Sequence, residues 1–264
     1  MEYTTLNNGQ KLPLVGFGVY QIPPRQTAEA VTTALNDGYR LIDTAEYYRN
    51  EKEVGAAVRQ SDIPRDEIFV TTKMPPQPSY AAAAQRIDES LRALDIDYID
   101  LMLIHWPGRA NVENYRALED AQKAGKVRSI GLSSFYGQEY QEILDQCEIV
   151  PVLDQNETHV FRQQQEFQKV LEAHGTKLES WSPLAEGQQG IFSNPVLVKI
   201  AAAHHKSVAQ VVLRFLTQRG IIVIPKSVHP ERIAENINLF DFELTSAEMA
   251  QIKTLDQKRS IFGW

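Results

Sequence analysis

The chain has 264 residues and a single cysteine, Cys147. One thiol can form neither an intrachain disulfide nor a metal site built from several cysteines. A disulfide-stapled secreted scaffold and a multi-cysteine zinc site are therefore excluded. A chain of this length buries about 70–75% of its unfolded surface, so its core can hold it folded without such staples.

Long apolar runs and basic clusters are also missing. No stretch of 18 apolar residues occurs, so no transmembrane helix is expected. Residues 1–5 lack the basic start and the apolar core of a signal peptide. The formal net charge of −7 argues against a nucleic-acid surface, but a small anionic ligand responds to local charge and remains compatible with it. We therefore expect a cytoplasmic protein that binds neither a membrane nor a nucleic acid.

Glycine-rich phosphate loops are incomplete. No G-x-x-x-x-G-K-[ST] segment occurs, and the first apolar run carries only Gly16 and Gly18 of a dinucleotide fingerprint that requires a third glycine. An open doubly wound sheet, which normally carries that fingerprint after its first strand, is therefore the less favoured alternative for the fold.

The chain does contain an alternation of short apolar runs with longer amphipathic stretches. The runs are rich in Val, Ile, Leu and Phe without strict polar alternation, as expected of strands buried on both faces. Eight strands alternating with helices favour parallel pairing through right-handed crossovers, and their closure gives a (β/α)8 TIM barrel, an α/β fold. The expected strands are residues 14–19, 40–43, 68–72, 98–104, 127–132, 150–153, 177–181 and 220–224.

Other elements are expected before, between and after these strands. Residues 3–14, with Asn7, Asn8 and Gly9 at their centre, predict an N-terminal β-hairpin that caps the bottom of the barrel. Residues 194–204 and 246–255 predict two additional helices outside the simple alternation. No linker divides the chain, and residues 1–264 are expected to form a single barrel domain.

Three consecutive expected strands end in side chains with complementary proton chemistry. Asp43, Lys73 and His105 end the second, third and fourth strands, and Tyr48 follows Asp43 by five residues. Strand ends of a barrel converge on one mouth, so these groups are expected to meet there. Lys73 would lower the pKa of the Tyr48 phenol, Asp43 would hold Lys73 charged, and His105 would bond the same substrate oxygen.

Such a set exchanges a proton with an oxygen on a carbon that undergoes a redox change. It lacks an activated nucleophile, which argues against acyl transfer, and one histidine with one aspartate makes a poor metal site. No metal is expected. A barrel hydrolase or isomerase would need a carboxylate pair or a metal at the rim, and neither is found.

Longer motifs around these residues resemble the aldo-keto reductase family over essentially the full chain. DTAEYYRNE at residues 43–51 is similar to the family's first signature, and YIDLMLIHWP at residues 98–107 is similar to its strand-4 signature. GKVRSIG at residues 125–131 and IPKSV at residues 224–228 are also family-like. The resemblance is nearest to short bacterial members similar to 2,5-diketo-gluconate reductases.

This resemblance implies a (β/α)8 barrel that reduces carbonyl groups with NAD(P)H. It implies Tyr48 as the general acid, Lys73 and Asp43 as the pair that tunes it, and His105 as the residue that orients the carbonyl. Small aldehydes, dicarbonyls such as methylglyoxal, and keto sugars are plausible substrates.

The resemblance also implies how the nicotinamide half of the cofactor is held. The matching residues are Ser133, Ser134, Gln155, Trp181, Ser182, Pro183 and Leu184. The first three match positions that hold the nicotinamide amide, Trp181 matches the aromatic that stacks on the ring, and the rest follow the pyrophosphate. Ser134 departs from the usual Asn and offers fewer donors and acceptors. Residues 185–193 are expected to fold over the cofactor and gate its release.

The adenosine half is implied to lie after the eighth strand. The matching residues are Lys226, Ser227, Arg232, Glu235 and Asn236. The first three match positions that hold a 2′-phosphate, and the last two match positions that contact adenine. Pro230 is expected to begin a helix whose N-terminus faces the phosphate. Two cations at this end favour NADPH over NADH, although NADH remains possible.

The substrate pocket is expected to be an apolar slot at the barrel mouth. Its expected residues are Tyr20, Tyr48, Met74, His105 and Trp106. Met74 stands where the family often has a large aromatic, which predicts a flexible and wider wall. The C-terminal stretch is short, so Phe262 and Trp264 are expected at most to lean over the rim of an open pocket.

Two other functions are less compatible with the sequence than carbonyl reduction. A cofactor-binding regulatory subunit would carry additional segments for a partner, and the chain shows none. A barrel hydrolase or isomerase would need a carboxylate pair or a metal at the rim, and the chain shows neither. The expected partner is a small carbonyl substrate, with no obligate protein partner and a monomeric state.

Overall fold

The structure is a computed structural model that describes residues 1–263. Within them, an eight-stranded parallel sheet has the strand order β10-β9-β8-β7-β6-β5-β4-β3. The order follows the sequence, as expected of consecutive right-handed crossovers. The strands are β3 (Phe17–Gly18), β4 (Leu41–Asp43), β5 (Phe69–Met74), β6 (Ile99–Ile104), β7 (Val127–Ser133), β8 (Leu153–Glu157), β9 (Lys177–Trp181) and β10 (Ile222–Val223).

Backbone bonds between the first and last strands close this sheet into a barrel. Val15 forms a parallel bridge with Val223. The Gly16 N–H donates to the Val223 carbonyl at 2.8 Å, and the Val223 N–H donates to the Leu14 carbonyl at 2.9 Å. The predicted (β/α)8 barrel is thus confirmed, and the doubly wound alternative is not found.

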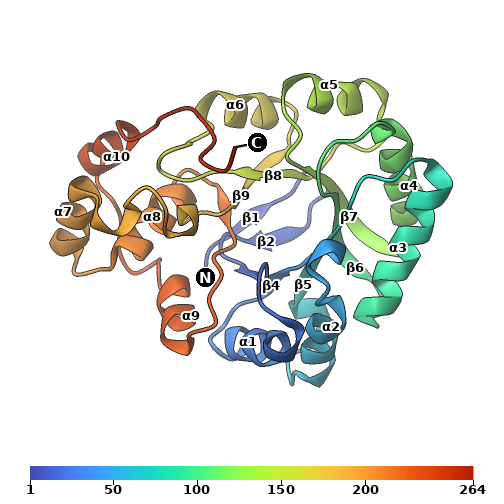
Figure 1. Ribbon diagram of the computed structural model, residues 1–264, viewed down its shortest axis with the longest axis horizontal. Helices are drawn as coiled ribbons and strands as arrows, with labels where there is room; N and C mark the ends of the chain where they lie inside the picture. The colour runs from blue at the N-terminus through green and yellow to red at the C-terminus, as the bar shows by residue number, and fades with distance from the viewer. Residues whose placement is uncertain (264) are drawn as a thin grey trace.

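A ring of helices surrounds the barrel (Figure 1). The two predicted additional helices are α7 and α10, which pack against each other, with His204 of α7 hydrogen-bonded to Glu248 of α10 at 2.9 Å. Pro230 begins α9, as expected. The helices are α1 (Pro24–Asn36), α2 (Glu51–Gln60), α3 (Tyr80–Leu94), α4 (Asn111–Lys123), α5 (Gly137–Gln146), α6 (Gln165–Ala173), α7 (Pro195–His204), α8 (Val208–Thr217), α9 (Pro230–Ile237) and α10 (Ser246–Lys253).

Local sequence explains where several of these helices begin. Ser207 and Thr245 each form a capping box with the residue three positions later, at the starts of α8 and α10.

No single helix of residues 1–263 is long and apolar enough to cross a membrane; α7 and α8 pass that test only as a pair bent by 90°.

The sixth strand lies later in the chain than its apolar run predicted. The run 150–153 contributes only Leu153, and the strand continues through four polar residues to Glu157, all of them buried. The prediction was wrong because it located strands by their apolar side chains alone. Here buried polar side chains on both faces of β8 occupy the strand.

Side chains alternate strictly between the two faces of the barrel strands. On β6, Leu101 and Leu103 belong to the core inside the barrel, whereas Met102 and Ile104 belong to the layer between strands and helices. Near their N-terminal ends the strands contribute mostly apolar residues to the inside. At their C-terminal ends the inward positions become polar, and this change places the site.

The predicted hairpin is present and covers the N-terminal end of the barrel. Its strands are β1 (Tyr3–Thr5) and β2 (Lys11–Pro13), paired antiparallel. Leu6 and Leu12 are buried in the inner core, and the Asn8 amide donates to Ser129 Oγ at 2.9 Å. Figure 1 looks into the opposite, C-terminal end, so the hairpin lies behind the barrel and the end of the chain lies in front.

Candidate active site

The alternation of side chains carries the predicted proton-transfer residues to the inside of the barrel mouth. Leu41 and Leu103 point inward, so Asp43 and His105, two residues further along, are placed on the same face. Lys73 stands in the corresponding position on β5, two residues after Thr71, and has no exposed surface. The three strand ends therefore meet as predicted.

A chain of hydrogen bonds connects three of the four residues. The Lys73 ammonium donates to Asp43 Oδ1 at 2.6 Å, to the Thr44 carbonyl at 2.9 Å and to Tyr48 Oη at 3.4 Å. Tyr48 ends the short helix η1 (Glu46–Tyr48), and Asn50 anchors the loop by bonding the carbonyls of Val19 and Ile22. All three donor positions of the ammonium are thus used.

Burial governs the charges of this chain. Burial lowers the pKa of Lys73, but Asp43 and Tyr48 raise it more, so the net direction is upward and the ammonium stays charged. Burial raises the pKa of Tyr48 to about 12, although Lys73 acts to lower it. Lys73 lowers the pKa of the phenol, as expected, but the net shift is upward because the loss of solvation outweighs one cation at 3.4 Å. Tyr48 therefore keeps its proton at neutral pH.

His105 lies beside the phenol, with ring centroids of Tyr48 and His105 5.5 Å apart. Burial, and then the charge of Lys73, lower the pKa of His105 to about 2, so the imidazole is neutral. Its Nδ1 atom is buried without a hydrogen-bond partner among the described residues. Nε2 likewise forms no hydrogen bond with the described residues, so it is free to donate to a ligand.

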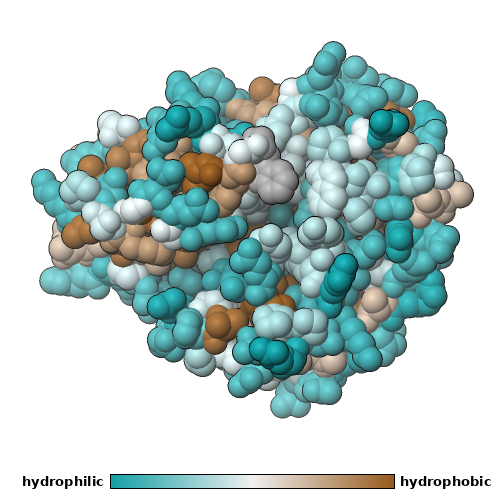
Figure 2. All heavy atoms as spheres, in the orientation of Figure 1, coloured by the Kyte–Doolittle hydropathy of each residue, from teal (hydrophilic) through white to brown (hydrophobic). Residues whose placement is uncertain are grey.

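Aromatic side chains form the rim around this group. Tyr20 stacks at a tilt on Tyr48, with centroids 5.0 Å apart, and Trp106 lies 4.6 Å from His105. Tyr47 meets Trp106 edge-on at 5.7 Å and is 64% exposed. The rest of this face is largely hydrophilic, with apolar residues gathered over α7 and α8 (Figure 2). A flat apolar carbonyl compound would fit against such a rim.

Met74 does not belong to this rim. It follows Lys73 on β5, so its side chain points to the opposite face, and it is fully buried in the layer between strands and helices. The expectation that Met74 forms a flexible wall of the substrate pocket was wrong, because successive residues of a strand point to opposite faces.

Residues predicted for the nicotinamide amide meet at the ends of β7 and β8. Ser133 pairs with Gln155 in the strand register, and the Ser134 N–H donates to the Gln155 carbonyl at 2.9 Å. Gln155 donates from its side-chain amide to Asp43 Oδ2 at 2.9 Å and to Glu179 Oε2 at 3.1 Å. Both amide hydrogens are used, which leaves the side-chain carbonyl oxygen as an acceptor.

Ser134 also occupies an unusual backbone conformation. Its φ is +61°, in the left-handed region that Asn tolerates better than Ser. The Asn that is usual at this position would suit the backbone as well as an amide ligand. The substitution therefore carries a local strain that the sequence alone does not reveal.

The chain end lies against the predicted stacking residue. Phe262 packs on Trp181 with centroids 5.3 Å apart. Glu157, at the end of β8, accepts the Ile261 N–H at 3.0 Å and holds this tail in place. Phe262 therefore leans over the rim at Trp181, as expected. Trp264, expected beside it, is outside the described residues.

The loop after Trp181 contains many left-handed residues. Ser182, Ala185, Glu186 and Gln189 all have positive φ, between 49° and 56°, and Ser182 donates to Glu186 at 3.3 Å. Pro183 is buried and Leu184 is half-buried.

The predicted adenosine end lies around the start of α9. Lys226 and Arg232 are exposed and form no salt bridge with the described residues. Ser227 accepts the His229 N–H at 3.0 Å and so shapes the turn into the helix. Glu235 is bonded by the Ser207 hydroxyl, and Asn236 is buried. Two cations without partners and a helix start form a donor set that fits a phosphate.

Two residues of the site were missed in the sequence. Glu179 is buried beside Gln155, and Tyr47 is part of the rim. Glu179 lies two residues before Trp181 on the same strand, so the alternation of β9 places both side chains inside the barrel. That spacing was the available signal.

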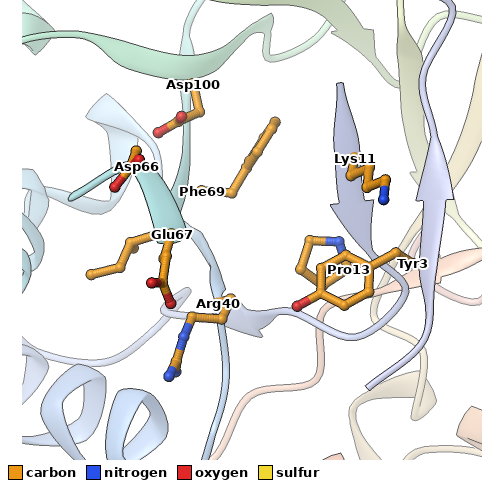
Figure 3. Close-up of a pocket in the computed structure, with 9 residues that line it drawn as sticks. Tyr3, Lys11, Pro13, Arg40, Asp66, Glu67, Phe69 and Asp100 are labelled. Atoms are coloured by element: carbon orange, nitrogen blue, oxygen red, sulfur yellow. The ribbon is translucent and has the colours of Figure 1, made fainter. Parts of the chain in front are cut away.

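A hollow of about 250 Å³ lies at the other end of the barrel, away from these residues (Figure 3). Tyr3, Lys11 and Pro13 of the hairpin form one side, and Arg40 and Glu67 lie opposite, just before β4 and β5. Because these residues precede their strands, the hollow belongs to the N-terminal face, where barrels carry stability and not catalysis.

Comparisons with known proteins agree with this geometry. The sequence profile of the Aldo/keto reductase family matches residues 14–257. Glyoxal reductase from Bacillus subtilis is 40% identical over 259 residues, covering 97% of this chain and 93% of that protein. Methylglyoxal reductase DkgA from Escherichia coli is 38% identical over 259 residues, covering 97% and 94%.

A solved structure gives the same picture. The crystal structure of a Bombyx mori aldo-keto reductase in complex with NADP superposes with a TM-score of 0.92 at 32% identity, covering 98% of this chain and 94% of that one. The resemblance noted in the sequence is confirmed. The chain belongs to the aldo/keto reductase family and is an NAD(P)H-dependent oxidoreductase that acts on carbonyl groups.

Proposed function

We propose that this protein reduces small aldehydes, ketones or keto sugars to alcohols, with NADPH as cofactor and Tyr48 as the general acid. The observation that carries the proposal is the bonding of one buried ammonium, that of Lys73, to both Asp43 and Tyr48 at the barrel mouth. The relatives named glyoxal reductase and methylglyoxal reductase support α-dicarbonyl compounds as substrates.

In this proposal the side chains bind the carbonyl and supply its proton. The hydride for the carbonyl carbon would come from NADPH when it is bound. Neutral His105 donates a hydrogen bond to the carbonyl oxygen and orients it. Tyr48, which is protonated at neutral pH, gives its Oη proton to the same oxygen. Lys73, held by Asp43, stabilises the phenolate that remains.

The proposed cofactor contacts are those that the family resemblance implies. The side-chain oxygen of Gln155 and the hydroxyls of Ser133 and Ser134 would hold the nicotinamide amide, and Trp181 would stack on the ring. Ser182, Pro183 and Leu184 would follow the pyrophosphate. Lys226, Ser227 and Arg232 would take the 2′-phosphate, with Glu235 and Asn236 at the adenine. Tyr20 and Trp106 would hold the substrate with Tyr47.

The test combines a substrate screen with one substitution. The purified protein is assayed with methylglyoxal and other small carbonyl compounds, with NADPH and NADH in parallel. Tyr48→Phe should lower kcat by about 10²–10⁴-fold, since a general acid contributes that much, and should leave NADPH binding within about twofold. Near-full activity in this variant would show that Tyr48 is not the acid.

The proposal extends to the setting of the protein. The whole chain would act as one barrel domain, which the single eight-stranded sheet and the family match over residues 14–257 support. A small carbonyl compound would be its partner, and the cytoplasm, where NADPH is the common reductant, would be its location. We propose that it works as a monomer.

A further inference from the structure

A buried carboxyl group beside the site has no part in the reaction described above. Glu179 lies on β9, has no exposed surface, and accepts a hydrogen bond from Gln155 Nε2 at 3.1 Å. The same nitrogen donates to Asp43 Oδ2 at 2.9 Å. Asp43 in turn binds the Lys73 ammonium. Glu179 is thus the far end of a chain of bonds that reaches Tyr48.

The two carboxyl groups decide which way the Gln155 amide points. An amide nitrogen has two hydrogens, and here each hydrogen has its own carboxyl acceptor. Rotating the amide by a half turn would break both bonds and place the amide oxygen against the oxygens of Asp43 and Glu179. The pair therefore keeps the Gln155 oxygen turned away from both acids and free to accept.

Charged groups from two other strands lie near Glu179. Asp43 faces it from β4 and Lys73 from β5, and Tyr48 binds the same ammonium. Burial, and then the charge of Asp43, raise the pKa of Glu179 well above its usual range, against the smaller effects of Gln155 and Lys73. Glu179 Oε1 is buried without a hydrogen-bond partner among the described residues. Among the described residues, Gln155 is the one hydrogen-bond partner of Glu179.

We propose that Glu179 is a positioning residue that locks the side-chain amide of Gln155, so that the Gln155 oxygen is presented to the nicotinamide amide of NADPH. This role rests on the proposed function, because it assigns Gln155 to that cofactor group. It predicts that reach and hydrogen-bond acceptance matter at position 179, whereas negative charge does not.

The substitutions Glu179→Gln, Glu179→Asp and Glu179→Leu separate these properties. Glu179→Gln keeps the length and an acceptor oxygen but cannot ionise. Glu179→Asp keeps the charge but is one methylene shorter, and Glu179→Leu fills the space without an acceptor. NADPH affinity is measured by fluorescence quenching, and kcat is measured at saturating NADPH. Urea unfolding confirms that each variant is folded.

Glu179→Asp and Glu179→Leu are expected to weaken NADPH binding by about 5- to 10-fold, the effect of one hydrogen bond. Glu179→Gln should stay within about twofold of the wild type. At saturating NADPH, kcat should change less than the affinity does in every variant. Glu179→Gln and Glu179→Asp suffice for the comparison if Glu179→Leu does not fold.

A double substitution tests whether the effect passes through Gln155. Gln155→Leu should weaken NADPH binding, and adding Glu179→Leu should weaken it no further, because the locked group is already gone. Three outcomes would overturn the proposal: weak binding by Glu179→Gln, normal binding by Glu179→Asp, or fully additive losses. If the wild type itself neither binds NADPH nor turns it over, the proposed function fails, and the two failures are thus distinguishable.

Discussion

The two faces of strand β8 are equally buried. The polar side chains on the inner face have hydrogen-bond partners, whereas those on the outer face have none among the described residues. On the inner face, both amide hydrogens of Gln155 have acceptors, and Glu157 accepts from Ile261 and binds Arg162. On the outer face, the side-chain oxygens of Asp154 and both polar side-chain atoms of Asn156 have no hydrogen-bond partner among the described residues.

The acidity of the two faces differs accordingly. Burial would raise the pKa of Glu157, but His159, Ser260, Ile261 and Arg162 together lower it to about 2. Burial raises the pKa of Asp154 to about 8; Asn156 and the Phe135 backbone act to lower it without forming bonds of normal geometry. Polar groups with partners can therefore carry function at little cost, while polar groups without partners lower stability.

The largest test of this contrast removes the central cation of the inner network. Lys73→Met leaves Asp43 and Glu179 buried without the one cation that acts on them among residues 1–263, so the free energy of unfolding should fall by about 3–5 kcal/mol. Urea unfolding measures this loss. Lys226→Met, which removes an exposed lysine, is the control and should change stability by less than about 0.5 kcal/mol. If Lys73→Met lowers the free energy of unfolding by less than about 1 kcal/mol, the partners of the inner network do not distinguish it from the outer face.

The second test concerns pH and the outer face. The pKa of Asp154 is about 8 in the folded state and near 3.8 when unfolded. The folded protein therefore binds the extra proton between these values, and stability is lost as pH rises toward 8, at up to about 1.4 kcal/mol per pH unit. Asp154→Asn cannot titrate, so the free energy of unfolding of the wild type should fall relative to that of the variant from pH 5 to pH 8. Parallel curves would contradict this.

The smallest expected effect has the opposite sign. Asn156→Val replaces an unpartnered amide with an apolar group of similar size, so stability should rise by about 1–2 kcal/mol, with kcat unchanged. Gln155→Leu is the matched control on the neighbouring residue. It removes an amide that has partners and should lower stability. If both variants shift the urea midpoint in the same direction, hydrogen-bond partners do not explain how the two faces affect stability.

Much of the site was predictable because strand ends and alternation are visible in the sequence. Asp43, Lys73 and His105 each end an apolar run, and the carboxyl ends of barrel strands face one mouth. Strict alternation of side chains along a strand also places Met74, one residue after Lys73, away from the pocket. It places Glu179, two residues before Trp181, inside it. Both predictions failed because the side chains of neighbouring residues were not assigned to opposite faces of their strands.

Other features could not be predicted because they depend on the environment that folding creates. The raised pKa of Tyr48 reflects burial that exceeds the effect of Lys73, and no spacing in the sequence measures that balance. β8 was displaced in the prediction because Asp154 and Asn156 are polar yet buried. Patterns of apolar residues locate strands only where burial and apolarity coincide.

The seam between β3 and β10 has a consequence for the order in which the protein folds. Neighbouring strands from β4 to β9 are joined by local crossovers, whereas the Val15–Val223 bridge joins the two ends of the barrel sequence. Closing the longest loop costs the most chain entropy, so this bridge should form last. Tyr20 follows one side of the seam and Lys226 the other. The barrel is therefore assembled before it can recognise its ligands, and the gain of NADPH affinity during refolding should mark the final step.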